Sequence, residues 1–168
     1  MIQFLYNRIS DAMYQRIWEK NYAHKLESFR NTHAGEDCFI IGNGPSLNKM
    51  KLSLLNDYYT FGLNKIFMIF EKNPFNPSYL VAVNRLVIEQ GREKFVKMPC
   101  PCFLPLVSAS KNKIKGSNIY YLRDRGKSSY FGKDLTQVIP TGPTVTFMAM
   151  QIAYFMGFKR VFLVGVDH

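Results

Sequence analysis

Residues 38–46 read Cys-Phe-Ile-Ile-Gly-Asn-Gly-Pro-Ser, a short apolar run that ends in a turn with two glycines. The run 38–41 has the length and composition of a strand buried in a parallel sheet. Gly42 and Gly44 allow a tight turn and a close approach of the backbone, and Pro45 suits the first position of a helix. The stretch therefore predicts a strand, a tight turn and a helix, the unit from which α/β sheets are built.

The same alternation continues along the chain. Further strands are predicted at 58–63, 79–83, 103–107, 119–122 and 161–166, and helices at 46–56, 87–95 and 144–156. The last strand, like the first, is expected to be buried. Strands that alternate with helices predict an α/β fold with a mostly parallel, Rossmann-like sheet flanked by helices. Apart from its strand, the basic stretch 108–133 is predicted to be rich in loops.

The N-terminal part of the chain has a different pattern of apolar and basic residues from the rest. We expect an N-terminal helix and linker over 1–35 and a nucleotide-binding domain over 36–168. Within residues 1–30, apolar side chains recur at three- and four-residue steps, namely Ile2, Leu5, Ile9, Met13 and Ile17. Such an amphipathic stripe favours packing against the domain or against a second copy of the chain, as a homo-oligomer. The basic opposite face leaves peripheral contact with an anionic membrane surface as the alternative.

The composition limits the partners and the compartment. The chain has 168 residues, which fits one domain, and a formal net charge of +10, which favours anionic partners. No apolar run reaches the length of about 18 residues expected of a transmembrane helix, and polar residues interrupt any signal-peptide core near the N-terminus. Cys38, Cys100 and Cys102 predict neither a structural disulfide nor a zinc site, so we expect a reduced, cytoplasmic protein.

Asparagines follow three of the predicted strand regions. Asn43 lies in the glycine turn, Asn64 follows strand 58–63, and Asn84 follows strand 79–83. Ligands of parallel sheets bind beyond the carboxyl ends of the strands. An asparagine both donates and accepts hydrogen bonds, which suits ribose hydroxyls, a base edge or a phosphate. Three asparagines at one sheet edge favour a binding site, and capping of a helix or turn is the alternative for each.

Two predicted helix starts are candidate phosphate sites. At the turn of Gly42 and Gly44, free N–H groups and the helix dipole favour an anion. This turn is not a dinucleotide fingerprint, because Leu47 replaces the third glycine. The second start follows Thr141 and Gly142. Gly142 allows close approach of a ligand, and Thr141 either contacts the ligand or caps the helix.

Taken in order, these motifs resemble those of two related groups of proteins. They are Gly42-Asn43-Gly44-Pro45-Ser46-Leu47, Phe61-Gly62-Leu63-Asn64, Asn84 to Gln90, Thr141-Gly142 and Val164-Gly165-Val166-Asp167. In the same order, they resemble the bacterial sialyltransferases of glycosyltransferase family 42. They equally resemble the broader 6-hydroxymethylpterin pyrophosphokinase-like (MptE-like) group, many of whose members look like enzymes of surface-glycan synthesis. The resemblance covers residues 38–90 and 138–167.

The sialyltransferase resemblance implies a CMP-sugar donor, a glycan acceptor and no obligatory metal or other cofactor. By position, Asn43 and Asn64 would contact the nucleotide phosphate and ribose, and Asn84 the donor sugar or its phosphate. Thr141-Gly142 would hold the nucleotide. The family's general base lies further past the last strand than His168, and its phosphate-stabilising tyrosines would lie further still. The resemblance therefore implies a donor site more than a complete enzyme, in a domain cut short at its C-terminal end.

The last two residues and the second family resemblance leave alternatives open. His168 is a candidate general base or metal ligand, or else a frayed terminal residue. The MptE-like resemblance implies an ATP- and Mg²⁺-dependent pyrophosphokinase, but only Asp167 supplies a carboxylate at a strand end. We therefore favour the metal-free donor site. A non-catalytic nucleotide- or nucleic-acid-binding module is the third alternative, and no nucleic-acid-binding motif supports it.

Overall fold

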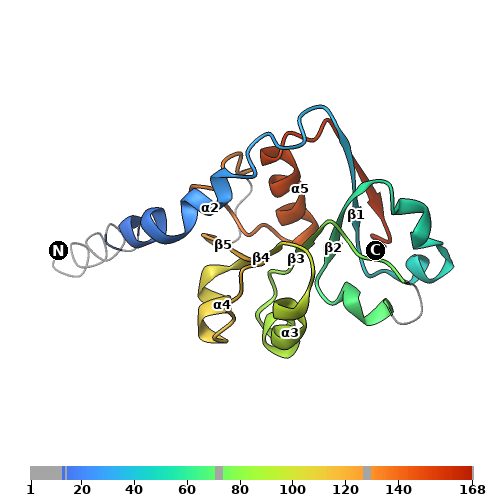
Figure 1. The fold of residues 1–168 in the computed structure, drawn as a ribbon, viewed down its shortest axis with the longest axis horizontal. Helices are drawn as coiled ribbons and strands as arrows, with labels where there is room; N and C mark the ends of the chain where they lie inside the picture. The colour runs from blue at the N-terminus through green and yellow to red at the C-terminus, as the bar shows by residue number, and fades with distance from the viewer. Residues whose placement is uncertain (1–12, 14, 71–73, 127–129, 168) are drawn as a thin grey trace.

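The computed structural model describes residues 13, 15–70, 74–126 and 130–167 (Figure 1). Its centre is a six-stranded sheet with the strand order β5-β4-β3-β2-β1-β6, in which all neighbouring strands are parallel. The strands are β1 (Asp37–Ile41), β2 (Tyr59–Leu63), β3 (Tyr79–Val81), β4 (Cys102–Pro105), β5 (Ile119–Leu122) and β6 (Arg160–Val164). The predicted Rossmann-like α/β fold is confirmed.

Helices cover both faces of the sheet (Figure 1). They are α3 (Arg85–Lys97), α4 (Leu106–Lys111) and α5 (Val145–Phe155), with short 3₁₀ turns η2 (Pro45–Lys49), η3 (Leu52–Leu55) and η4 (Ile66–Ile69). Alternate strand residues point to opposite faces: Ile40 packs in the cluster that contains α5, and Ile41 in the cluster that contains α3 and α4. The apolar runs are buried strands because both faces are covered.

The N-terminal helix packs on the face that α5 covers. Its described part consists of helical residues 15–18, a π turn η1 (Glu19–Ala23) and α2 (His24–Glu27). Trp18 and Leu26 are fully buried, and Trp18 Nε1 donates to Thr136 O at 3.0 Å. This agrees with packing on the domain, but the contact is not made by the predicted stripe. Met13 and Ile17 are exposed, because the large Trp18 ring takes the core-facing position.

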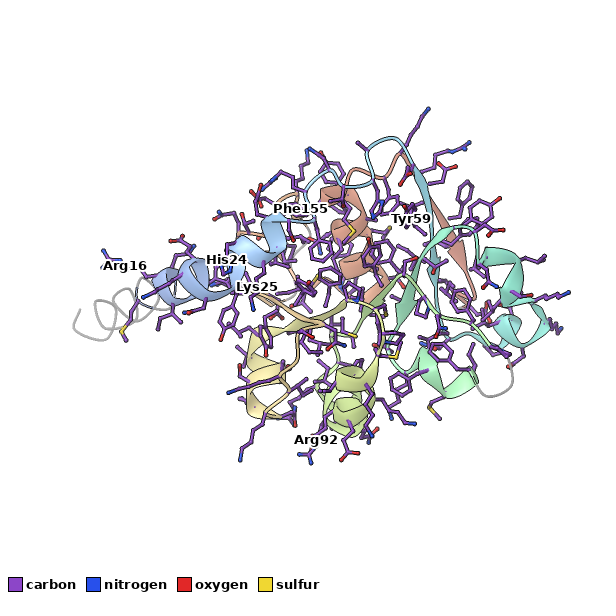
Figure 2. All side chains as sticks on the ribbon, in the orientation of Figure 1. Arg16, His24, Lys25, Tyr59, Arg92 and Phe155 are labelled. Atoms are coloured by element: carbon purple, nitrogen blue, oxygen red, sulfur yellow. The ribbon has the colours of Figure 1, made fainter. Side chains whose placement is uncertain are left out.

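Several basic side chains lie on the outside of the molecule. Figure 2 shows Arg16 on the N-terminal helix and Arg92 on α3, both directed away from the sheet. Residues 1–12 of the predicted helix lie outside the described part, so contact with a membrane surface or with a second chain stays a prediction. Within the described part, no helix combines the length and apolarity needed to span a membrane.

Three local predictions are wrong. The helix predicted at 46–56 is two 3₁₀ turns, because Met50 between them is extended (ψ 142°). The stretch from 108 begins in α4 and not in a loop, and its exposed Lys111 lies on that helix. The last strand, β6, is not buried. It pairs with β1 alone among the described strands, and Phe162 is 41% and Leu163 50% exposed.

Candidate functional site

The direction of the sheet reverses at β1. From β1 to β5 each new strand is added on one side, whereas β6 returns to the other side of β1. In open parallel sheets, ligands bind in the crevice outside the carboxyl ends of the strands at such a switch point. The turn that follows β1 and the segment that follows β6 meet at this switch point.

The glycine turn packs directly on the end of β6. Gly42 N donates to Val164 O and Gly44 N donates to Gly165 O, both at 2.8 Å. A Cβ atom on Gly42 would overlap Gly165 O. The two glycines are therefore required by contact between two strand ends, in addition to any role in binding a ligand.

A carboxylate of the chain occupies the candidate phosphate position at this turn. Asp167 Oδ2 accepts from Ser46 N at 2.7 Å, and Asp167 Oδ1 accepts from Ser46 Oγ at 2.5 Å. A Cβ atom on Gly44 would overlap the Asp167 carboxyl group. Pro45 begins η2, which has only five residues. The amide and hydroxyl of Ser46, which the sequence offered to a ligand, are thus bonded to Asp167.

The three asparagines have different surroundings. Asn43 Nδ2 donates to Leu63 O at 2.9 Å and so ties the glycine turn to the end of β2. Asn84 caps α3, since its Oδ1 accepts from Leu86 N at 2.9 Å and from Val87 N at 3.3 Å. The capping alternative therefore holds for Asn84 and extends α3 beyond its predicted start.

Asn64 is the asparagine with an unused acceptor. Its Oδ1 atom is buried and has no hydrogen-bond partner among the described residues. Its backbone has a φ of 52°, and Asn64 N donates to Val81 O at 2.8 Å. A buried acceptor without a partner is costly and rare. A ligand that donates to Oδ1 would remove that cost.

Two cavities meet at Asn64. One, of about 470 Å³, is lined by Asn64, Asn84, Gly126, Thr141, Gly142, Thr144 and three apolar or proline residues. The other, of about 360 Å³, is lined by Asn43, Gly44, Asn48, Asn64, Lys65 and four apolar residues. The structure thus places all three predicted asparagines and the Thr141-Gly142 segment in the lining of two cavities that share Asn64. We refer to the two cavities together as the donor crevice, after the role proposed below.

The Thr141–Thr144 wall of the donor crevice is held by internal hydrogen bonds. Thr141 Oγ1 donates to Asp124 Oδ2 at 2.8 Å, and Thr144 Oγ1 caps α5 by accepting from Phe147 N at 3.2 Å. Gly142 has a φ of 70°, and a Cβ atom there would overlap the Phe147 ring. Thr144 is therefore the cap of α5, and Thr141 is held by the carboxylate of Asp124, which follows β5.

Lys65 is a crevice residue that sequence reasoning missed. It follows Asn64 at the carboxyl end of β2, and its Nζ donates to Gln90 Oε1 on α3. Among the described residues that line the two cavities, it is the single cationic side chain. Its position directly after a strand end was the available signal.

The remaining predicted groups do not add a metal site in the described part. His168 lies outside the described residues. The described residues include no group of three or more His, Cys, Asp or Glu side chains arranged to hold a metal ion. Cys38, Cys100 and Cys102 are buried free thiols. Burial raises the pKa of the Cys38 thiol to about 12, so this thiol is not activated as a nucleophile.

Comparison with known proteins agrees with the fold. The structure is similar to that of the MAf glycosyltransferase from Magnetospirillum magneticum AMB-1, with a TM-score of 0.60 and 16% sequence identity. The match covers 88% of this chain and 28% of that glycosyltransferase. No curated protein matches the sequence. Residues 13–168 match the family described as 6-hydroxymethylpterin diphosphokinase MptE-like. The chain therefore belongs to the MptE-like family.

Proposed function

We propose that the chain binds the nucleotide-sugar donor of a glycosyltransferase, with a CMP-sugar as donor and a glycan as acceptor. The observation that carries the proposal is the buried, unpartnered Oδ1 of Asn64 in the donor crevice, at the carboxyl edge of a parallel sheet. The fold shared with a glycosyltransferase and the sequence resemblance to sialyltransferases support the same reading.

The crevice matches the polar groups of a nucleoside. Asn64 Oδ1 is suited to accept a hydrogen bond from a ribose hydroxyl or a base amino group. Asn84 has its oxygen committed to the cap of α3, so its amide nitrogen is the part that can serve a ligand. Gly142 allows the backbone to approach closely. Together these groups recognise a ligand without adding charge.

Glycosyl transfer also needs a base for the acceptor hydroxyl and stabilisation of the departing phosphate. The described residues furnish the donor side of this reaction. His168 stays a candidate base, as the sequence predicts. No metal ion is required by the proposal, since the crevice contacts are amides, hydroxyls and one ammonium group.

An ATP-dependent pyrophosphokinase is the second candidate, because the family description names a diphosphokinase. This activity would need Mg²⁺ beside the triphosphate. The sequence predicted one carboxylate at the carboxyl edge, Asp167, and this was wrong, because Asp124 also lies there after β5. Each of the two accepts a hydrogen bond from a hydroxyl of the chain. The two candidates differ in the nucleotide and in the need for Mg²⁺.

A thermal-shift panel of CMP, CDP, UDP, GDP and ATP, each with and without Mg²⁺, tests the proposal. A ligand that binds only the folded state adds about 2.7 kcal/mol of stability at one hundred times its dissociation constant. We expect CMP to raise the melting temperature equally with and without Mg²⁺. Stabilisation by ATP alone, and only with Mg²⁺, would favour the pyrophosphokinase. No shift with any nucleotide would reject the donor site.

A further inference from the structure

We propose that the phosphate of the bound nucleotide lies at the carboxyl end of β2, against Lys65, and not in the glycine turn after β1. The inference rests on the proposed function, since it assigns the phosphate within the same donor crevice. It makes Lys65 the phosphate-binding residue of the site.

The glycine turn is a poor phosphate site because a carboxylate already occupies it. Asp167 accepts hydrogen bonds from both the amide and the hydroxyl of Ser46. A phosphate placed there would lose these donors and would lie beside a like charge, which disfavours the ionised form of both groups. The five-residue η2 adds little helix dipole to offset this repulsion.

Lys65 has the opposite properties. Lys65 lines the cavity of about 360 Å³, and the residue is half-buried. Its hydrogen bond goes to Gln90, a neutral amide, which orients the ammonium group without neutralising it. Among the described residues, no carboxylate forms an ion pair with Lys65. A lysine ammonium group is a common point-charge partner for phosphate.

The nucleoside and phosphate positions are consistent with each other. Asn64 lines both cavities and Lys65 lines the second one. A nucleotide whose ribose or base donates to Asn64 Oδ1 from the first cavity would extend its phosphate into the second cavity, which Lys65 lines. The hydrogen bond from Asn43 Nδ2 to Leu63 O fixes the end of β2 against the glycine turn and so holds this wall in place.

The position also fits the chemistry of transfer. The bond between the anomeric carbon of the sugar and the phosphate oxygen breaks, and its electron pair stays on that oxygen. A new bond forms from the acceptor oxygen to the anomeric carbon, and the acceptor proton passes to a general base. The nucleoside phosphate gains negative charge as it departs, and the Lys65 ammonium group offsets that charge.

Isothermal titration of CMP and of cytidine to the same chain tests the assignment. Three proteins are compared: wild type, Lys65→Gln, and the control Lys49→Gln. Lys49 is an exposed lysine beside Asn48, and it does not line the crevice. Both variants lose one positive charge. Melting temperatures of the free proteins verify that each variant is folded.

We expect Lys65→Gln to weaken CMP binding by about 10- to 100-fold, the loss typical of a charge-assisted hydrogen bond, and to leave cytidine binding within about twofold. Lys65→Arg should restore part of the CMP affinity. Equal CMP affinity in Lys65→Gln and wild type, or a larger loss in Lys49→Gln, would overturn the assignment while leaving the nucleotide site intact. Failure of wild type to bind either ligand would instead overturn the proposed function, and the assignment with it.

Discussion

Replacing Asn64 with glycine should stabilise the free protein and weaken its ligand binding. Burial of the unpartnered Oδ1 costs about 1–3 kcal/mol. The φ of 52° costs a non-glycine residue about 1 kcal/mol more. Glycine itself lowers the free energy of unfolding by about 0.5–1 kcal/mol, because it gives the unfolded chain more conformational freedom. The net expectation for Asn64→Gly is a gain of about 1–3 kcal/mol in the free energy of unfolding.

Urea unfolding of the free protein and titration with CMP measure the two effects separately. In a thermal melt of a chain of this size, each 1 kcal/mol added to the free energy of unfolding raises the melting temperature by about 2–4 °C. If Asn64 Oδ1 accepts a hydrogen bond from the nucleotide, the same substitution weakens CMP binding by about 1–3 kcal/mol. Opposite signs in stability and in affinity are the signature of a residue kept for its ligand.

Asn31→Gly is the matched control. Asn31 has nearly the same backbone conformation, with a φ of 55°, and its side chain is exposed. The control therefore measures the backbone contribution alone. If Asn64→Gly gains no more stability than Asn31→Gly, then Oδ1 is not an unsatisfied acceptor. If Asn64→Gly binds CMP like wild type, then Asn64 is not a ligand contact.

Three further predictions concern the framework of the site. Gly44→Ala should destabilise the protein by about 1–3 kcal/mol in urea unfolding, because the new Cβ overlaps the Asp167 carboxyl group; an unchanged midpoint would show that the carboxylate moves freely. Arg160 holds the pKa of Asp37 below its usual value through a paired hydrogen bond. The stability that this pair contributes is fully present above the unfolded pKa of about 3.9 and is lost as the pH falls through the folded pKa. Asp37→Asn should therefore make the fall of stability at acid pH less steep. Identical curves of stability against pH for the variant and the wild type would contradict this prediction. Trp18→Ala should cost about 3–5 kcal/mol, since the buried ring and its bond to Thr136 dock the N-terminal helix; a loss below 1 kcal/mol would show that docking contributes little.

Residues 38–41 and 59–63 illustrate what local sequence predicts well. Each is a short run of mostly apolar residues. Gly42 follows the first run and Asn64 follows the second, and both residue types are common in turns. Each run is a strand of the sheet. The Asn64 position was predicted because parallel strands bring their carboxyl ends to one edge. Its unpartnered oxygen could not be predicted, because burial of a single atom depends on which distant residues close around it.

The contact between Ser46 and Asp167 shows where local reasoning stops. The two residues are 121 positions apart, and only the return of β6 to the far side of β1 brings them together. A glycine turn followed by proline has the same sequence pattern whether a phosphate or a carboxylate of the chain binds at its end. Lys65 was missed for a related reason, since a lysine after a strand is usually solvated, and its place in the cavity lining and its bond to Gln90 depend on the fold.

If the donor crevice binds a nucleotide-sugar as proposed, its charge bears on which one. With the glycine turn filled by Asp167, the described lining residues offer one cation, Lys65. A CMP-sugar carries one phosphodiester charge, which one ammonium group can balance. A UDP- or GDP-sugar carries two phosphate charges, and ATP carries more, so each would need additional cations or Mg²⁺. CMP should therefore bind more tightly than UDP without Mg²⁺, and Lys65→Gln should weaken the binding of both. Tighter binding of UDP than CMP to the wild type would contradict charge matching as the basis of selection.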